Sequence, residues 1–383
     1  MTRRSASRYR RAAAAAFFGL VLLALAAAGP AEGQAIIKVS DTVTLRFGVY
    51  LQAQADWLQL TNATLTDTIG YQQNLFLRRA RLLFGGRIAS DVYFYMDTDN
   101  SRLGYNKTGN SALGSGFQLL DAFGEWRIAD AFMLDGGLIP VPYSREALTS
   151  SSGEFFFDAS AYDYLQQTST QSTGGNRDTG FLARGYFADH RLEYRLGVFQ
   201  GARQTAQSKN AFRVSGRLQW EFFDREDMYS PGWIGSTFYP GWYQDKKVLA
   251  VGAGFDTQKN FRYYSGDLFA AFPVSKSGSI QGKFQYQYVN GGTTFAALPL
   301  ENTEQVDLGY YFNSLHIAPI VRWEQRIFNG QPSKSDMRYG GGLNWYPFKA
   351  NAPLNIKVVY IRVDPKTGVS TNEFGIQLQF FYW

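Results

Sequence analysis

The sequence predicts an all-β fold, a single antiparallel transmembrane β-barrel of about sixteen strands with one loop folded into its interior. Three observations predict it. Apolar and polar residues alternate along segments that recur through most of the chain. The chain also contains 24 Tyr, 31 Phe and 39 Gly, an abundance typical of membrane barrels with aromatic girdles. Its N-terminal segment, finally, is typical of exported proteins.

That N-terminal segment has the layout of a secretory signal peptide. Five arginines precede an apolar stretch over residues 12–28, and small residues follow it. The stretch is short of the roughly 20 apolar residues that a membrane-spanning helix needs. We therefore expect residues 1–35 to be cleaved during export, after Gly33 or Ala35, which leaves residues 36–383 as one barrel domain. An uncleaved helical anchor is the alternative.

Composition limits the possible chemistry and partners. The net charge of +6 includes five arginines and one glutamate of the segment that we expect to be removed. Taking these five from the 38 basic residues and the glutamate from the 32 acidic ones leaves 33 and 31. A nearly balanced charge gives no indication of nucleic-acid binding. The chain has no cysteine, which excludes disulfides and thiolate chemistry.

The clearest alternation runs over residues 43–57. Fifteen residues of period two exceed the usual five or six of a globular strand. Such a length suits a tilted strand that crosses a bilayer and projects beyond it. Because successive side chains point to opposite faces of a strand, the phase assigns two sets. We expect Leu45, Phe47, Val49 and Leu51 to face lipid, and Arg46, Tyr50 and Gln52 to face the lumen.

Sixteen segments alternate in this way, and an even number is expected for a bacterial barrel made from one chain. Sixteen strands leave a water-filled channel inside the barrel. The chain ends on an alternating segment and aromatic residues, which resembles the C-terminal assembly signal of outer-membrane proteins, although Trp383 lies one residue out of step. We expect strands near residues 43–57, 75–88, 91–99, 117–128, 131–139, 178–187, 190–200, 211–223, 247–257, 261–274, 278–290, 304–314, 315–327, 337–347, 354–363 and 372–382.

Two long stretches do not alternate. Residues 140–176 are rich in Ser, Thr and Gly and carry an acidic and aromatic cluster at 154–158, whereas residues 225–247 carry Pro-Gly-Trp twice. Connections of this length are usually functional or disordered, and their aromatic content argues against disorder. We expect residues 140–176 to fold into the lumen as a constriction, with Phe155 and Phe157 inside the barrel.

Six short segments follow one another along the chain: Phe76-Leu-Arg-Arg-Ala-Arg81, Gly137-Leu-Ile-Pro-Val-Pro-Tyr-Ser-Arg-Glu146, Leu196-Gly-Val-Phe-Gln-Gly201, Gly309-Tyr-Tyr-Phe312, Pro319-Ile-Val-Arg-Trp-Glu324 and Gly342-Leu-Asn-Trp-Tyr346. In this order they resemble the phosphate- and polyphosphate-selective porins, porins O and P. The resemblance implies a sixteen-stranded, trimeric channel in outer-membrane lipid that passes small hydrophilic solutes by diffusion and mildly prefers anions such as phosphate or polyphosphate.

Cations recur at positions that the alternation turns toward the lumen. Such groups can pass an anion from one to the next by charge-assisted hydrogen bonds without holding it too tightly. The alternative is that each cation is paired with an inward acid on a neighbouring strand. The expected ion pathway consists of Arg79, Arg81, Arg213, Arg217, Arg322 and Lys283, with Lys357 as a further inward cation. The inward acids are Asp97, Asp99, Asp121, Glu125, Glu221 and Glu324.

The sequence gives little support for an enzyme. Its two histidines, His190 and His316, lack the spacing of metal ligands and are expected at a rim or an interface. It contains no Gly-x-Ser-x-Gly elbow, phosphate-binding Gly-rich lysine loop or paired-His motif. We therefore expect no catalytic residue, no cofactor and no metal. An outer-membrane β-barrel hydrolase is the rival class, and a non-selective structural barrel is a third possibility.

Overall fold

The computed structural model of the chain describes residues 35–59, 70–100, 116–164, 176–202, 211–226, 238–239, 241–243, 245–295, 300–348 and 353–383. Apart from Ala35, the expected signal peptide lies outside the described residues. Within these ranges, no helix combines the length and the apolar character that crossing a membrane requires.

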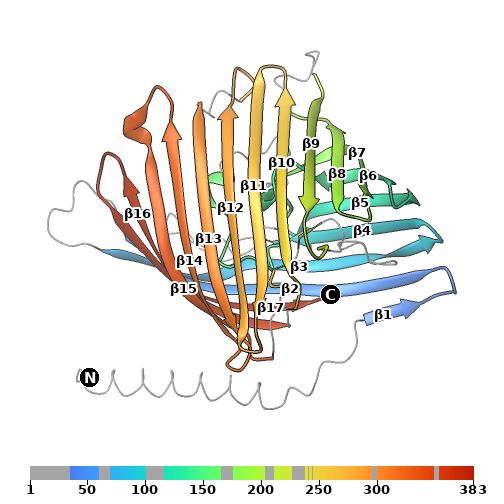
Figure 1. Cartoon of the computed structure of the whole chain (residues 1–383), viewed down its shortest axis with the longest axis horizontal. Coiled ribbons are helices and arrows are strands. Elements are labelled where there is room, and N and C mark those ends of the chain that lie inside the picture. The colour runs from blue at the N-terminus through green and yellow to red at the C-terminus, as the bar shows by residue number, and fades with distance from the viewer. Residues whose placement is uncertain are drawn as a thin grey trace.

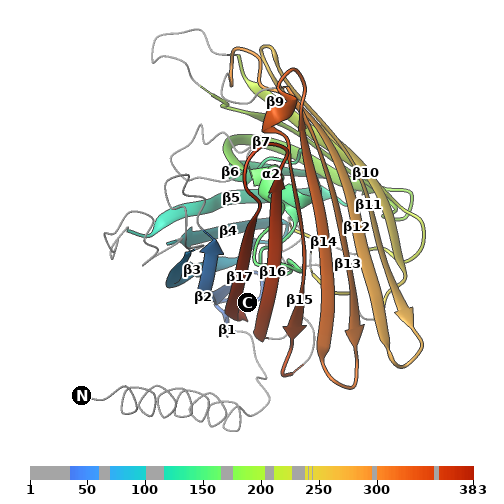
Figure 2. The same cartoon turned by 90° about the vertical axis from the view of Figure 1, so that its left-hand side faces the viewer.

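Seventeen strands form one sheet, and sixteen of them close into an antiparallel barrel (Figures 1 and 2). Strands β2 to β17 each pair with their neighbours in sequence, and the pairing of β17 with β2 closes the wall. The predicted barrel of about sixteen strands is confirmed. The wall strands are β2 (Thr44–Gln59), β3 (Tyr71–Ala89), β4 (Val92–Asp99), β5 (Gln118–Ala129), β6 (Phe132–Pro140), β7 (Arg177–Phe187), β8 (Leu192–Phe199), β9 (Arg213–Glu221), β10 (Val248–Gln258), β11 (Phe261–Val274), β12 (Gly278–Asn290), β13 (Glu301–Phe312), β14 (Ile317–Phe328), β15 (Asp336–Trp345), β16 (Leu354–Pro365) and β17 (Thr371–Tyr382).

The two faces of the wall follow the predicted phase. Tyr50 and Gln52 are buried in the barrel, with 2% and 0% of their surface exposed, whereas Val49 on the outer face is 40% exposed. Leu45 departs from the expectation, because it is half-buried rather than exposed. The reason is the short strand β1 (Ala35–Lys38), which the alternation did not predict and which pairs with the start of β2 beside Leu45.

Because neighbouring strands run in opposite directions, the connections fall alternately at two ends of the barrel. One end holds the start of β2, the C-terminus and short turns such as residues 90–91 and 275–277 (Figure 1). We call this the short-turn end. The other end holds longer connections, including residues 141–176, which contain η1 (Glu146–Leu148) and α2 (Ala161–Tyr164). The β9–β10 connection belongs to the short-turn end in spite of its length.

A second short 3₁₀ helix, η3 (Pro332–Lys334), joins β14 to β15. The segment that carries α2 lies within the outline of the barrel (Figure 2). The wall therefore encloses part of its own connections, and the candidate site lies where they meet its inner face.

Candidate constriction site

Residues 141–163, which we call the inward loop, leave β6 and fold back against the inner wall. Phe155 and Phe156 are buried in one cluster with Tyr311 of β13 and Tyr346 after β15. The carbonyl of Phe155 accepts a hydrogen bond from the Asn344 amide at 2.9 Å. The prediction that residues 140–176 enter the lumen is therefore confirmed for residues 141–163, whereas residues 165–175 lie outside the described part of the chain.

Two consecutive arginines of β3 bind one carboxylate of the inward loop. Arg78 donates from Nε and Nη2 to the Asp158 oxygens at 2.9 and 2.7 Å, and Arg79 donates from Nη2 to Asp158 at 2.6 Å. Residues two apart, not adjacent ones, normally share a strand face. Here the pairing with β2 shifts register between Gln52 and Ala53. Such a β-bulge re-aims side chains, so both guanidinium groups reach the loop.

The pair of arginines sets the ionisation of Asp158. Burial opposes the charged form, but the Arg78 and Arg79 guanidinium groups outweigh it and hold the pKa of Asp158 well below its usual range. Asp158 therefore stays a carboxylate at any physiological pH. Two positive charges of the wall share this one anion of the loop.

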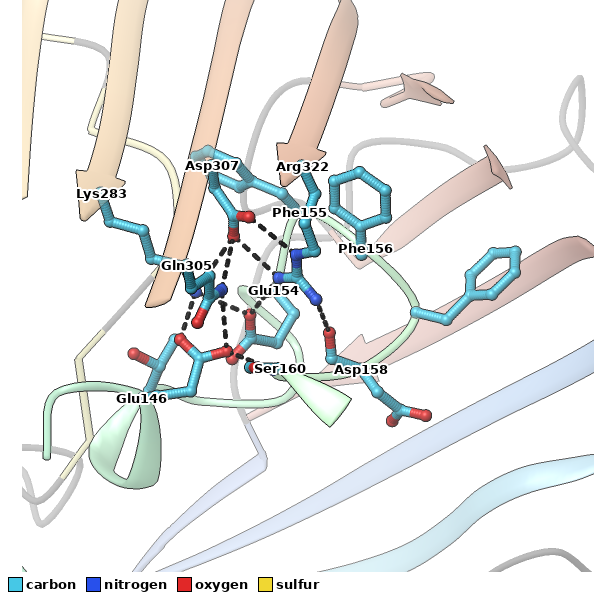
Figure 3. Close-up of polar contacts among 12 residues, drawn as sticks. Glu146, Glu154, Phe155, Phe156, Asp158, Ser160, Lys283, Gln305, Asp307 and Arg322 are labelled. Carbon is cyan, nitrogen blue, oxygen red and sulfur yellow. Dashed lines mark hydrogen bonds and ion pairs between the residues drawn. The ribbon is translucent and has the colours of Figure 1, made fainter. Parts of the chain in front are cut away.

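A second ionic cluster lies where the inward loop meets β12, β13 and β14 (Figure 3). Lys283 forms an ion pair with Glu146 and lies 3.4 Å from Glu154 and 3.3 Å from Asp307. Arg322 donates from Nε to Asp307 at 2.7 Å and from Nη1 to the carbonyl of Asp158 at 3.0 Å. These wall cations face loop acids, so the loop partly neutralises the inner wall at this level.

Glu154 is the carboxylate of this cluster whose protonation changes near neutral pH. Burial and the neighbouring charge of Glu146 raise the pKa of Glu154 to about 7, although Lys283 and Arg322 pull it down. Its Oε1 atom is buried and has no hydrogen-bond partner among the described residues. Lys357 lies beside it and donates to the Glu154 and Phe156 carbonyls at 2.6 and 3.0 Å.

The structure thus brings three predicted pathway residues to the inward loop: Arg79, Arg322 and Lys283. The other three pair with acids of nearby wall strands: Arg81 with Asp99 (3.0 Å), Arg213 with Asp256 (2.9 Å) and Arg217 with Asp267 (2.8 Å). Several of the predicted inward acids have cationic partners too, as Glu125 has in Arg184 and Glu324 in Arg338. The contacts agree with paired wall electrostatics, and the role of these cations in ion passage stays a prediction.

Sequence reasoning missed Arg78, because strict alternation places it on the outer face. A signal was present, since a lipid-facing arginine near mid-membrane costs about 2–4 kcal/mol. Two consecutive arginines inside a wall strand therefore indicate a bulge that turns both inward. Asp158 and Glu154 were noticed only as part of an acidic and aromatic cluster, and no local pattern shows which wall cation each would meet.

The two histidines lie in turns at the short-turn end. His190 follows β7, with Nε2 3.4 Å from Asp130, and His316 precedes β14 and stacks on Tyr311. Among the described residues no three His, Cys, Asp or Glu side chains are grouped as metal ligands would be.

Comparisons with known proteins place these features in context. The family model of the phosphate-selective porins O and P matches residues 47–231. An uncharacterised protein from Aquifex aeolicus (strain VF5) is 22% identical over 353 residues, which cover 81% of this chain and 81% of that protein. The stretch that the family model matches includes β3 with its arginine pair and the described part of the inward loop.

Solved structures share the fold at low sequence identity. An anion-selective porin from Comamonas acidovorans is 10% identical, with a TM-score of 0.60 over 89% of this chain and 100% of its own. OmpF of Salmonella typhi in complex with daunomycin is 15% identical, with a TM-score of 0.56 over 90% and 100%. DcaP of Acinetobacter baumannii, an outer-membrane channel, is 10% identical, with a TM-score of 0.53 over 90% and 99%. The family match over residues 47–231 and the closed sixteen-stranded barrel make this chain similar to the phosphate-selective porins O and P.

Proposed function

We propose that the chain is an outer-membrane porin that passes small hydrophilic solutes by diffusion, with a mild preference for anions such as phosphate or polyphosphate. The observation that carries this proposal is the inward loop, which folds into the lumen of a sixteen-stranded barrel and meets inward cations of its wall. A soluble protein would have no use for a wall that is apolar outside and ionic inside. Both rivals, the hydrolase and the structural barrel, lack a specific observation in their favour.

The electrostatics of the site support a mild preference rather than a strict filter. Arg78 and Arg79 share one carboxylate, and Lys357 binds carbonyl oxygens of the loop. In the second ionic cluster acids outnumber cations, because Lys283 and Arg322 face Glu146, Glu154 and Asp307. Charges inside a water-filled pore are also screened over a Debye length of about 10 Å at 0.1 M salt. Preference for anions should therefore weaken as salt rises.

The proposed setting follows from the barrel itself. Its outer face carries exposed apolar side chains such as Leu82, Leu268 and Val321, which suit lipid. Bacterial barrels place their short turns in the periplasm, so the short-turn end would face the periplasm. Export through a cleaved signal peptide of residues 1–35 and assembly as a homotrimer belong to the same proposal.

Recording from single channels in a planar lipid bilayer tests the function directly. The purified, refolded chain should insert and conduct in steps, and its reversal potential in a KCl gradient should favour chloride over potassium. Added phosphate or polyphosphate should reduce the chloride current if these anions enter the same path. A barrel that is folded but silent would overturn the proposal and leave the structural barrel standing.

A further inference from the structure

A second segment enters the lumen, from the short-turn end. It belongs to the β9–β10 connection, and its described residues include Glu226, Tyr239, Trp242 and Tyr243, all of them buried. The sequence indicated that residues 225–247 are ordered but not where they lie. Because the inward loop enters from the opposite end, the two segments approach each other through the length of the barrel.

The backbones of the two segments meet directly. Thr149 and Tyr239 form a parallel β-bridge, in which Tyr239 N–H donates to the Leu148 carbonyl at 2.7 Å and Ser150 N–H donates to the Tyr239 carbonyl at 2.9 Å. A Cβ atom on Gly241 would lie 2.7 Å from the Cα of Gly153. Only a glycine permits so close an approach, so the contact is built into the sequence.

Trp242 packs against both the inward loop and the wall. Its indole stacks on Phe155 with ring centres 4.5 Å apart and an angle of 15°. Its Nε1–H donates to the Tyr346 hydroxyl at 2.7 Å. On β13, a Cβ atom on Gly309 would come within 2.7 Å of the indole, so the missing side chain makes room for it.

The residues around Trp242 also belong to segments identified in the sequence by their resemblance to porins O and P. Gly309, Tyr311, Ile320 and Tyr346 come from three of the segments that resemble porins O and P. All of them border Trp242 or share its buried cluster. Positions scattered over three segments of the wall thus converge on one side chain of a fourth segment.

An ion pair ties the second segment to the loop as well. Arg145 of the inward loop donates to both Glu226 oxygens, at 2.7 and 2.6 Å, and the pair is buried. The Arg145 guanidinium also lies 4.3 Å from the centre of the Tyr239 ring. The Tyr239 hydroxyl in turn donates to Glu193 of β8 at 2.8 Å. Backbone, aromatic and ionic contacts therefore join the two segments into one unit.

We propose that the β9–β10 segment is a second constriction element, and that Trp242 is the residue through which it limits the size of passing solutes. This inference rests on the proposed porin function. A solute that moves from end to end must cross the level at which the two segments meet. There the indole of Trp242 is buried between the inward loop and the wall, so it fills part of the cross-section of the lumen and leaves less of it open to solutes.

The test compares Trp242→Ala with the wild-type chain in planar bilayers. Single-channel conductance should rise by about twofold, because conduction depends on the narrowest part of a pore. The smallest polyethylene glycol excluded from the channel, measured by its failure to lower conductance, should become larger. Trp126→Ala is the matched control, since Trp126 is 53% exposed on the outer face, and it should leave both quantities unchanged.

Trp242→Phe is a second variant that keeps the test informative if Trp242→Ala does not fold. It keeps a ring that can stack on Phe155 but removes the bond to Tyr346 and part of the volume, so it should give a smaller rise in conductance. If the folded Trp242 variants conduct like the wild type and exclude the same polymers, the second constriction element is wrong while the porin function stands. If the wild-type chain itself does not conduct, it is the porin function that fails.

Discussion

The inward loop and the β9–β10 segment lie in the same lumen but are held there by different chemistry. The loop meets the wall through charges: Asp158 binds Arg78 and Arg79, and Glu146 binds Lys283. The β9–β10 segment meets the wall through its aromatic side chains, with Trp242 on the Tyr346 hydroxyl, Tyr243 against Phe269 and Tyr239 donating to Glu193. Its buried ion pair, between Glu226 and Arg145, is made with the loop.

From this difference we expect the two segments to control different properties of the pore. Charged side chains act on ions at a distance, so the loop should govern which sign of ion the pore prefers. Neutral aromatic side chains act by occupying space, so the second segment should govern solute size. The contacts that the two segments make with the wall also differ in strength. Breaking a buried ion pair by removing one partner costs about 3–5 kcal/mol, whereas an aromatic pair adds about 0.5–1.5 kcal/mol beyond its area.

The sharpest test of the ionic contacts between the inward loop and the wall is Asp158→Asn. The change removes the anion that Arg78 and Arg79 share, while the amide can still accept hydrogen bonds from them. A unit charge about 4 Å away contributes about 1 kcal/mol at the dielectric constant of water, which corresponds to roughly a fivefold change in a ratio. The chloride-to-potassium permeability ratio, measured from the reversal potential in a KCl gradient, should rise by about that factor.

Asp364→Asn is the control for this variant. Asp364 pairs with Arg362 at 2.9 Å near the end of β16, outside the inward loop. The same loss of one carboxylate should therefore leave the permeability ratio near the wild-type value. Equal shifts in the two variants would mean that the ratio follows total charge rather than the loop.

The β-bulge in β3 leads to a second prediction. Because the bulge turns both Arg78 and Arg79 onto the loop, replacing the two together by Gln should shift the reversal potential toward cations. The double change of Arg79 and Arg81 to Gln should shift it less, since Arg81 is bound to Asp99 of the wall. Reversal potentials of both double variants in the same KCl gradient make the comparison. A larger effect of the Arg79 and Arg81 pair would contradict the assignment of Arg78 to the site.

Glu154 should make the ion preference set by the inward loop depend on pH. An acid whose pKa is raised to about 7 is neutral below that value and negative above it. As pH falls from 8 to 6, one negative charge leaves the site and the preference for anions should grow, by about twofold if screening is strong. Reversal potentials at pH 6, 7 and 8 measure this change. Glu154→Gln should abolish it and hold the preference at its low-pH value; a slope that persists in this variant points to another group, such as Asp163.

Much of the fold was accessible from the sequence. The predicted ends of every wall strand agree with the structure within four residues, the largest difference being at the start of β3. Alternation succeeds in a barrel because each wall position meets either lipid or the lumen. It fails where that condition is broken, as at the bulge beside Arg78 and at Leu45, which β1 covers.

The site was less accessible, for a physical reason. Alternation identified Arg79, Arg322 and Lys283 as inward, but their partners Asp158, Asp307 and Glu146 lie tens of residues away in sequence or on another strand. Pairing across a lumen depends on how the enclosed segments fold. No periodicity describes a loop, so the meeting of Phe155 with Trp242 required the structure.

The smallest expected effect is that of Tyr346→Phe, which alters the contact between the wall and Trp242 of the β9–β10 segment. The change removes the oxygen that accepts hydrogen bonds from Trp242 Nε1–H at 2.7 Å and from the Asn344 amide at 3.4 Å. A buried donor without its partner costs about 1–3 kcal/mol, so the indole should move more freely and the open-channel current should become noisier. The permeability ratio should not change, because no charge is altered.

Tyr360→Phe is the matched control, since the Tyr360 hydroxyl bonds to Asn372 at 2.6 Å on an exposed side chain. It should leave both current noise and permeability ratio as in the wild type. The decisive comparison is with Asp158→Asn. If Tyr346→Phe moved the permeability ratio as far as that variant does, the neutral segment would share control of ion preference. The division between a charged loop and a space-filling segment would then be wrong, because disturbing either segment would disturb the same property.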